Sequence, residues 1–390
     1  MLKVLMLAPT PFFSDRGCHI RIYEEARALV RLGVQVRIAT YFAGQDAPGI
    51  DMVRAGKWVG YQKLTSGPSL KKPFMDLALL RKTREEINNF RPDILHCHLH
   101  EGAFIGLLAR RSSLPVLLDY QGSLAGELIE HQPFFKTQLF SSIIKSVESW
   151  INNSVGRILL NAESLGAEIG AAAKSRCRVV GDGVDTDRFA PQPADPAFRA
   201  EAGLPPDGPV IVFLGLLNHY QGADLLLETA GILKDRGTKF SMLVMGYPLG
   251  EYPARAEKMG LSRMVKFPGR IDYFQAQRWL ALGDIAVAPK IALSESNGKL
   301  LNYLALGMPM VCFDRPVNRE LVGDCAIYAP YKAGDEVANS ESLASALRQL
   351  LDDPSLRKDL SARARARALK SFSWEAVARR ILESYSEVLG

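Results

Sequence analysis

Short apolar segments alternate with helix-like segments along almost the whole chain, and this alternation is the feature that most restricts its possible folds. A short apolar run bounded by turn residues is typical of a buried parallel strand, whereas apolar residues recurring every three or four positions are typical of an amphipathic helix. Because consecutive parallel strands need a crossover between them, regular alternation predicts an α/β protein with parallel sheets.

The strand-like segments fall into two groups. In the first half of the chain they are residues 2–8, 34–40, 93–99, 115–119, 156–161 and 177–180, and in the second half 209–215, 240–246, 264–269, 284–289, 309–313 and 326–329. A helical pattern over 20–32 stops at Gly33, a residue suited to the left-handed conformation that closes a helix. Each group is large enough for one doubly wound sheet, which binds ligands beyond the carboxyl ends of its strands.

Two domains are expected, because 390 residues exceed what one hydrophobic core usually supports. A proline-rich stretch between the two groups of strands breaks both periodicities. The prediction is a Rossmann-like domain over 1–190, a linker over 191–207 and a second Rossmann-like domain from 208 onward. Two such sheets facing each other would share a ligand-binding cleft.

Composition and missing motifs exclude several classes of protein. No apolar run approaches the roughly 18 to 20 residues of a membrane span, and the first residues are too short and strand-like for a signal peptide. The five cysteines are scattered and lack metal-ligand spacing, which predicts reduced thiols and a cytoplasmic protein. The chain has no G-x-G-x-x-G, P-loop, G-x-S-x-G or H-E-x-x-H motif, which disfavours dehydrogenases and P-loop kinases.

Positive charge is concentrated between Arg54 and Arg91, where nine residues are basic and three are acidic. This local excess equals the net charge of +6 of the whole chain. The segment is either a solvated face or a surface for anionic phospholipid or a phosphorylated acceptor. No RNA- or DNA-binding motif accompanies the charge, so nucleic acid is not an expected partner.

The most informative segment runs from Ser294 to Pro309, directly after the strand predicted over 284–289. A helix is expected to begin near Gly298, with Ser296 or Asn297 as its N-cap, and to end at Gly307. A polar turn leading into a helix N-terminus offers unpaired backbone N–H groups to an anion, and Lys299 would add a charge. Taken alone, the segment is equally compatible with an ordinary connection between a strand and a helix.

Several segments, taken together, resemble the retaining glycosyltransferases of family four. The helix ending ALGMPM at 305–310 is similar to that family's A-x-G-x-P-V, which follows an E-x7-E pattern. Further similar segments occur in the family's order at 93–98 (DILHCH), 181–189 (GDGVDTDRF), 212–226, 269–284 and 372–374 (FSW). The resemblance extends over nearly the whole chain. It implies a GT-B fold in which residues 208–371 bind the nucleotide sugar and a final helix over 372–390 crosses back to the first domain.

The resemblance also implies an activity: transfer of a hexose from a nucleotide sugar to an acceptor hydroxyl, with retention of configuration and without a bound metal. Several ligand-contacting positions depart from the family pattern. Asn302 stands for the second glutamate of E-x7-E and Ser294 for the first, with Glu295 one position away. The remaining departures are Leu216 and Gln221 for a basic pair beside the diphosphate, Arg16-Gly17 for a glycine pair, and Gln121 for the histidine of V-H-G.

These considerations define the predicted site. The predicted donor-binding residues are Arg16, Gly17, Gln221, Arg270, Lys290, Ser296, Asn297, Gly298, Lys299, Leu300 and Asn302. The predicted catalytic residues are His98, Gln121 and Glu295, and the predicted acceptor-side residues are His19 and Asp119. Lys290 and Lys299 are the preferred countercharges for the diphosphate, since they flank the turn that should face the cleft. No cofactor and no metal are expected, because the alternating histidines at 96, 98 and 100 lack a carboxylate or cysteine at ligand spacing.

Other interpretations remain open from the sequence. The altered ligand-contacting positions also fit a GT-B binding protein that has lost transfer, and the fold also serves sugar-nucleotide epimerases. The acceptor is a lipid-linked sugar, a polysaccharide or a small molecule, with a role in cell-envelope glycan synthesis and peripheral attachment to the inner face of the plasma membrane as the expected setting. The amphipathic segment 134–150 is expected to pack against the core, with a lipid-facing role as the alternative.

Overall fold

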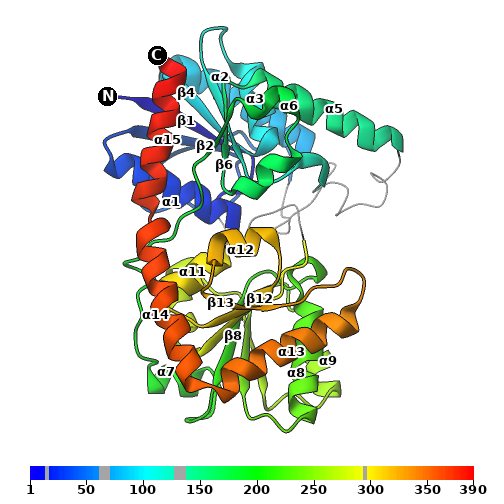
Figure 1. Ribbon diagram of the computed structural model, residues 1–390. Helices are drawn as coiled ribbons and strands as arrows, with labels where there is room; N and C mark the ends of the chain where they lie inside the picture. Colours follow the sequence, from blue (N-terminus) through cyan, green and yellow to red (C-terminus); the bar gives the residue numbers. More distant parts are fainter. Residues whose placement is uncertain (14–16, 61–70, 127–137, 293–296) are drawn as a thin grey trace. The chain divides into compact units, whose positions relative to one another are not determined.

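A computed structural model describes residues 1–13, 17–60, 71–126, 138–292 and 297–390 (Figure 1). The chain divides into two compact units. The first unit joins Met1–Gly183 to Trp374–Gly390, and the second contains Val184–Leu293 and Asn297–Ser373. Each unit is built on one sheet of parallel strands covered by helices, so the predicted α/β class with two Rossmann-like sheets is confirmed.

The first unit contains a seven-stranded sheet in the order β3-β2-β1-β4-β5-β6-β7. Its strands are β1 (Lys3–Ala8), β2 (Gln35–Thr40), β3 (Asp51–Arg54), β4 (Ile94–His98), β5 (Val116–Tyr120), β6 (Arg157–Leu160) and β7 (Cys177–Val179). Its helices are α1 (Gly17–Arg31), α2 (Lys72–Asn89), α3 (Leu99–Ala109), α5 (Gln138–Ser154), α6 (Ala171–Lys174) and α15 (Trp374–Leu389). The strand order reverses between β1 and β4, and such a reversal leaves a crevice at the carboxyl ends of the two strands.

The second unit contains a six-stranded sheet in the order β10-β9-β8-β11-β12-β13. Its strands are β8 (Val210–Leu214), β9 (Ser241–Met245), β10 (Val265–Gly269), β11 (Ile285–Ala288), β12 (Met310–Phe313) and β13 (Ala326–Ala329). Its helices are α7 (Pro196–Glu201), α8 (Ala223–Asp235), α9 (Tyr252–Lys258), α10 (Ala276–Leu280), α11 (Lys299–Ala305), α12 (Pro316–Val322), α13 (Glu336–Asp352) and α14 (Pro354–Ser371). Here the order reverses between β8 and β11.

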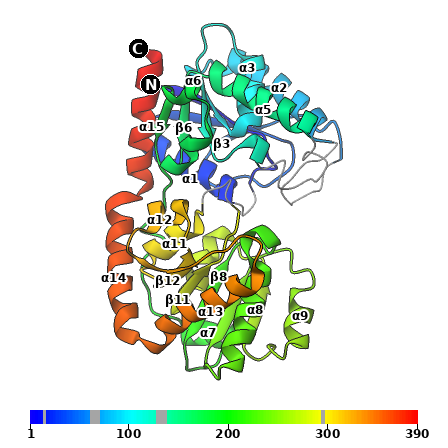
Figure 2. The same ribbon diagram turned by 45° about the vertical axis from the view of Figure 1, so that its right-hand side comes forward.

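Both sheets are buried between layers of helices, as Figures 1 and 2 show for each unit. Strands covered on both faces are apolar throughout and not alternating. Thus Val4 to Ala8 of β1 have no exposed surface. In the second unit Phe213, Leu226 and Leu347 belong to one core cluster that joins β8 to α8 and α13. This packing fixes the strand ends, and therefore the loops that follow them.

The predicted strands are all present, and β3 is the one strand of the described residues that the sequence failed to indicate. That strand has four residues, lies at the sheet edge and has no fully buried side chain, so no apolar pattern marks it. The helix predicted over 20–32 is α1, and Gly33 follows it with a φ of 85° as expected. The expected N-cap of α11 is wrong for Asn297, because Gly298 occupies that position and the Asn297 side chain bonds Asn318 instead.

Helix α5 differs from the expectation of core packing. Its apolar residues Ile143, Val147 and Trp150 are exposed, while residues 134–137 of the predicted amphipathic segment lie outside the described part of the chain. None of the helices in the described parts of the chain has the length and apolar character of a membrane span.

Candidate functional site

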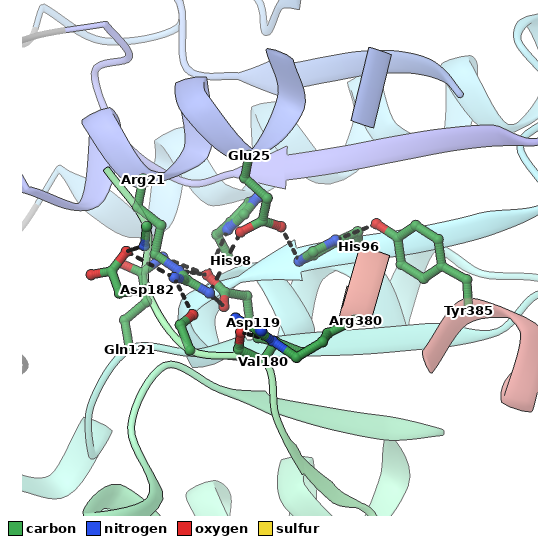
Figure 3. A network of polar contacts seen from close by, with 12 residues as sticks. Arg21, Glu25, His96, His98, Asp119, Gln121, Val180, Asp182, Arg380 and Tyr385 are labelled. Carbon is green, nitrogen blue, oxygen red and sulfur yellow. Dashed lines mark hydrogen bonds and ion pairs between the residues drawn. The ribbon is translucent and has the colours of Figure 1, made fainter. Parts of the chain in front are cut away.

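A buried polar cluster lies at the strand reversal of the first unit, where α1 crosses the ends of β4 and β5 (Figure 3). Arg21 of α1 bonds both carboxylate oxygens of Asp119 on β5, with Nε at 3.0 and 3.2 Å and Nη2 at 2.8 Å. His98, the last residue of β4, lies with Nδ1 3.0 Å from Asp119 Oδ2. The side-chain amide of Gln121 donates to the same oxygen at 2.8 Å. Asp119 is therefore the common acceptor of three side chains.

Electrostatics keep this acceptor ionised. Burial alone would raise the pKa of Asp119, but the Arg21 guanidinium and the His98 bond hold it well below its usual value. Since an ionised carboxylate can only accept, His98 must donate through Nδ1. His98 Nε2 is buried without a hydrogen-bond partner among the described residues.

The predicted catalytic and acceptor-side residues of this unit thus fall into two classes. His98 and Asp119 have no exposed surface, and their polar atoms contact neighbouring side chains, so a direct contact of either residue with a substrate stays a prediction. Gln121 is only partly buried. His19 is also fully buried, with its ring 5.7 Å from that of Phe12.

Arg21 is the central residue that sequence reasoning missed. It also donates to the carbonyl of Gly181 at 3.0 Å and to Asp182 at 3.1 Å, which ties α1 to the segment after β7. That segment is the one that resembles the family's N-G-V-D-x-x-x-F pattern. A usable signal existed, because Arg21 and Glu25 lie one turn apart on the side of α1 that also carries the buried Leu29.

Glu25 begins a second branch of the network, which ends on the C-terminal helix (Figure 3). Its Oε1 lies 3.2 Å from Nε2 of His96, whose Nδ1 lies 2.6 Å from the hydroxyl of Tyr385 on α15. Burial, reinforced by the charge of Asp119, raises the pKa of Glu25 well above its usual value, and burial lowers the pKa of His96 well below its own. Both shifts favour the neutral form of the group concerned.

Four residues of this cluster are of types that can bind a metal ion. Glu25, His96, His98 and Asp119 each offer one ligand atom, and these atoms lie within 4.8 Å of one another. The Arg21 guanidinium already supplies a positive charge to Asp119, and burial favours the neutral form of Glu25. His96 Nε2, His98 Nε2 and both carboxyl oxygens of Glu25 are buried without a hydrogen-bond partner among the described residues. The cluster therefore retains possible ligand atoms, including the carboxyl groups that the sequence did not indicate, and the absence of a metal stays a prediction.

The second unit presents its own polar site at the strand reversal between β8 and β11. Lys299, the first residue of α11, donates through Nζ to Gln221 Oε1 at 2.5 Å. The same Nζ lies 4.9 Å from the centre of the Phe213 ring on β8. Gln221 follows β8 along the chain and Lys299 follows β11, so this bond joins the two sides of the reversal.

Glycines let the loops of this edge approach closely. A Cβ on Gly222 would lie 2.1 Å from the carbonyl oxygen of Pro289, directly after β11. A Cβ on Gly246, after β9, would lie 1.8 Å from the carbonyl oxygen of Gly215, after β8. Lys290 follows Pro289 and is 5% exposed. The ends of β8, β9 and β11 thus form one polypeptide surface around Lys290, Lys299 and Gln221.

The other predicted donor-binding residues are buried or half-buried, lie at other places in the fold, or lie outside the described residues. The side chain of Leu300 has no exposed surface and belongs to the core, and Asn302 is half-buried. Arg270 follows the edge strand β10 and stacks on Tyr247 at 5.5 Å. Gly17 begins α1 in the first unit. Arg16, Glu295 and Ser296 lie outside the described residues.

Two family models match the chain and identify its family. The model described as Glycosyltransferase Family 4 matches residues 16–188, and the one described as Glycosyl transferases group 1 matches residues 195–367. The chain belongs to glycosyltransferase family 4. Together the two models span nearly the whole length of this glycosyltransferase, and the family resemblance noted from its motifs is confirmed.

Relatives with known names support this assignment over the full length. The D-inositol 3-phosphate glycosyltransferase 2 of Catenulispora acidiphila is 27% identical over 402 residues, covering 95% of this chain and 90% of that protein. The sucrose-phosphate synthase of Thermosynechococcus elongatus has a similar structure, with a TM-score of 0.81 at 16% identity. The match covers 100% of this chain and 99% of the synthase chain. Anabaena HepE, solved in complex with UDP and glucose, gives a TM-score of 0.77 at 15% identity, with coverage of 99% and 100%. The fold is therefore GT-B.

Proposed function

We propose that this glycosyltransferase moves a hexose from a nucleoside-diphosphate sugar to an acceptor hydroxyl, with retention of configuration and without a bound metal. The observation that carries the proposal is the Lys299–Gln221 bond at the strand reversal of the second unit. It holds an ammonium group at the sheet edge where doubly wound sheets bind nucleotides. Similar structures solved with UDP and UDP-glucose, both Anabaena HepE, favour a donor of this kind.

The chemistry of transfer explains why a fixed cation is needed there. As the bond between the anomeric carbon and the phosphate oxygen breaks, negative charge grows on the departing diphosphate. Preorganised donors and cations at that position commonly contribute several kcal/mol to the transition state. Lys290 and Lys299 supply that charge in this proposal. The amide oxygen of Gln221 orients the Lys299 ammonium without neutralising it.

Retention requires the acceptor oxygen to bond the anomeric carbon on the face from which the diphosphate leaves. The acceptor hydroxyl proton passes to the departing phosphate oxygen, so no protein nucleophile takes part. In the first unit, Gln121 offers a partly exposed amide whose orientation is fixed by the ionised Asp119. Its Nε2 faces Asp119, so its Oε1 remains to accept a hydrogen bond from a sugar hydroxyl.

Incubation of the purified protein with a panel of nucleotide sugars tests the proposal. Transfer to an added acceptor, or slow hydrolysis to a free sugar of the same kind, is the expected result. Failure of every nucleotide and nucleotide sugar to raise the melting temperature would instead indicate a binding protein of another specificity. Release of an isomerised sugar would indicate an epimerase.

The acceptor in this proposal is a sugar or lipid-linked sugar of the cell envelope, reached from the cytoplasmic face of the membrane. The support is the excess of basic residues between Arg54 and Arg91, of which Lys63 lies outside the described residues. Several of these charges are already paired, since Lys72 contacts Glu101 and Lys82 contacts Glu86 at 3.1 Å. Electrostatic attraction is thus weaker than the count of basic residues suggests.

A further inference from the structure

Helix α5 of the first unit exposes a continuous apolar stripe. The side chains of Phe140, Ile143, Val147 and Trp150 are 37%, 51%, 38% and 47% exposed. At about 100° per residue these four positions fall within an arc of about 80° on the helix surface. A helix in a soluble domain normally turns such a stripe toward the core.

The opposite orientation of α5 is fixed by polar contacts on its inner side. Glu148 accepts from the backbone N–H of Ala125 at 2.9 Å and from the hydroxyl of Ser123 at 3.1 Å. Asn152 Oδ1 lies 3.2 Å from Nε2 of the buried His100. Rotation of α5 to bury its apolar stripe would break these bonds and leave a buried carboxylate unsatisfied. The outward stripe is therefore a stable feature of the fold.

Helix α3 extends this apolar surface. Its residues Phe104 and Leu108, one turn apart, are 40% and 45% exposed, and the ring centres of Phe104 and Trp150 lie 6.0 Å apart. The two helices lie side by side in both ribbon views (Figures 1 and 2). Together the exposed residues of the two helices form a surface that we name the α3–α5 ridge, which consists of Phe104, Leu108, Phe140, Ile143, Val147 and Trp150.

Basic side chains adjoin the ridge through α2. One exposed face of α2 begins with Phe74 and Leu77 and continues with Arg81 and Arg84. The Arg84 guanidinium donates to the carbonyl of Leu108 at 3.0 Å, which places this charge directly beside the ridge. Apolar and aromatic side chains next to arginines match a bilayer surface that contains anionic lipid.

We propose that the α3–α5 ridge inserts into the boundary between headgroups and acyl chains of an anionic bilayer. This inference rests on the proposed membrane attachment and deepens it. The ridge itself lies outside the basic stretch and makes an apolar contact that salt does not screen, whereas the adjoining Arg81 and Arg84 belong to that stretch. A second copy of the chain fits the surface less well. A symmetric dimer through the same patch would bring like charges of Arg81 and Arg84 together.

Vesicle sedimentation with the full-length protein tests the insertion. The variant carries Ile143→Asp and Val147→Asp, and its matched control carries Ser142→Asp and Ser146→Asp, which add the same charge to the polar exposed side of α5. We expect binding to vesicles of phosphatidylglycerol and phosphatidylcholine to fall at least about tenfold in the variant and much less in the control. Equal binding of variant and control would overturn the proposal.

Fluorescence quenching by brominated acyl chains locates the contact. Quenching should be lost in Trp150→Phe and kept in Trp58→Phe, because Trp58 is an exposed tryptophan of the basic stretch and not of the ridge. The reverse result would indicate docking through the basic stretch alone and would refute insertion. A dimer in solution that Ile143→Asp dissociates would assign the ridge to a second copy. Nucleotide binding, measured on the same variants without lipid, should stay unchanged, so a failure here is distinguishable from a failure of the transferase proposal.

Discussion

Replacement of Arg21 by methionine tests the buried network of the first unit most directly. The substitution keeps a side chain of similar length but removes three contacts with Asp119, one with Asp182 and one with the Gly181 carbonyl. Arg21 is 3% exposed and Asp119 has no exposed surface, so water cannot replace the lost partner. Breaking a buried ion pair by removing one member costs about 3 to 5 kcal/mol in unfolding free energy. Asp119 keeps its bonds to His98 and Gln121, so we expect the lower end of that range.

The pKa of Asp119 determines how the loss of stability in Arg21→Met should change with pH. In the native protein the folded pKa of Asp119 is depressed, so its stabilising contribution is present above the unfolded pKa and is lost as the pH falls. Without Arg21, burial raises the pKa of Asp119 and the carboxyl is protonated at a higher pH. The difference in unfolding free energy between native protein and variant should therefore shrink as the pH falls from 7 toward 4.

Urea unfolding followed by circular dichroism measures both effects. The double variant Arg21→Met/Asp119→Asn is the control, because it removes both charges together. Its loss of unfolding free energy should be smaller than the sum of the two single losses by about 1 to 3 kcal/mol. Additive single losses, or a loss of less than about 1 kcal/mol in Arg21→Met, would refute the assignment of Arg21 as the counterion of Asp119.

Four further outcomes are expected. Glu25→Gln should flatten the loss of stability as the pH rises above 4.5, because a raised folded pKa contributes stability that disappears with increasing pH; an unchanged profile in urea unfolding would contradict a raised pKa of Glu25. Lys299→Ala should weaken binding of nucleoside diphosphate by about 1.5 to 3 kcal/mol in calorimetry and leave nucleoside binding nearly unchanged, whereas equal losses would indicate a structural lysine. Asn302→Glu should bind the nucleotide as tightly as the native protein or more tightly, since a carboxylate accepts a ribose hydroxyl bond more strongly; weaker binding by a folded variant would mean that the ribose is held elsewhere. Excess chelator should leave donor binding intact, and loss of binding that Mg²⁺ restores would exclude a metal-independent site.

The sequence predicted the elements that are regular and failed where tertiary context decides. Buried parallel strands produce continuous apolar runs, and those runs located every strand except the edge strand β3. Gly33 marked the end of α1 because the left-handed conformation there disfavours other residues. The cap of α11 was misplaced because Asn297 has a better partner in Asn318, which lies 21 positions later in the chain.

The candidate site was only partly accessible to sequence reasoning. The family pattern named Gln221 and Lys299 as donor-binding residues, and the structure joins them by a hydrogen bond because both follow strands that flank the reversal of the second sheet. Donor binding by these two residues stays a prediction. The family pattern gave no sign of Arg21, and only the one-turn spacing of Arg21, Glu25 and Leu29 indicated that this side of α1 is buried. The exposed stripe of α5 was equally hidden: hydrophobic spacing reveals that a helix is amphipathic, but only the bonds of Glu148 and Asn152 reveal which side faces inward.

The C-terminal helix α15 is packed into the first unit, although the chain enters it from the second. Tyr385 reaches His96, Arg380 donates to the carbonyl of Val180 at 2.7 Å, and a Cβ on Gly183 would collide with the Trp374 ring at 2.6 Å. During synthesis the first unit therefore emerges from the ribosome long before the helix that completes it. Until α15 is synthesised, the nascent first unit lacks the helix that covers the polar groups of His96 and Glu25. A chain without the last seventeen residues, Trp374–Gly390, would lack this cover permanently.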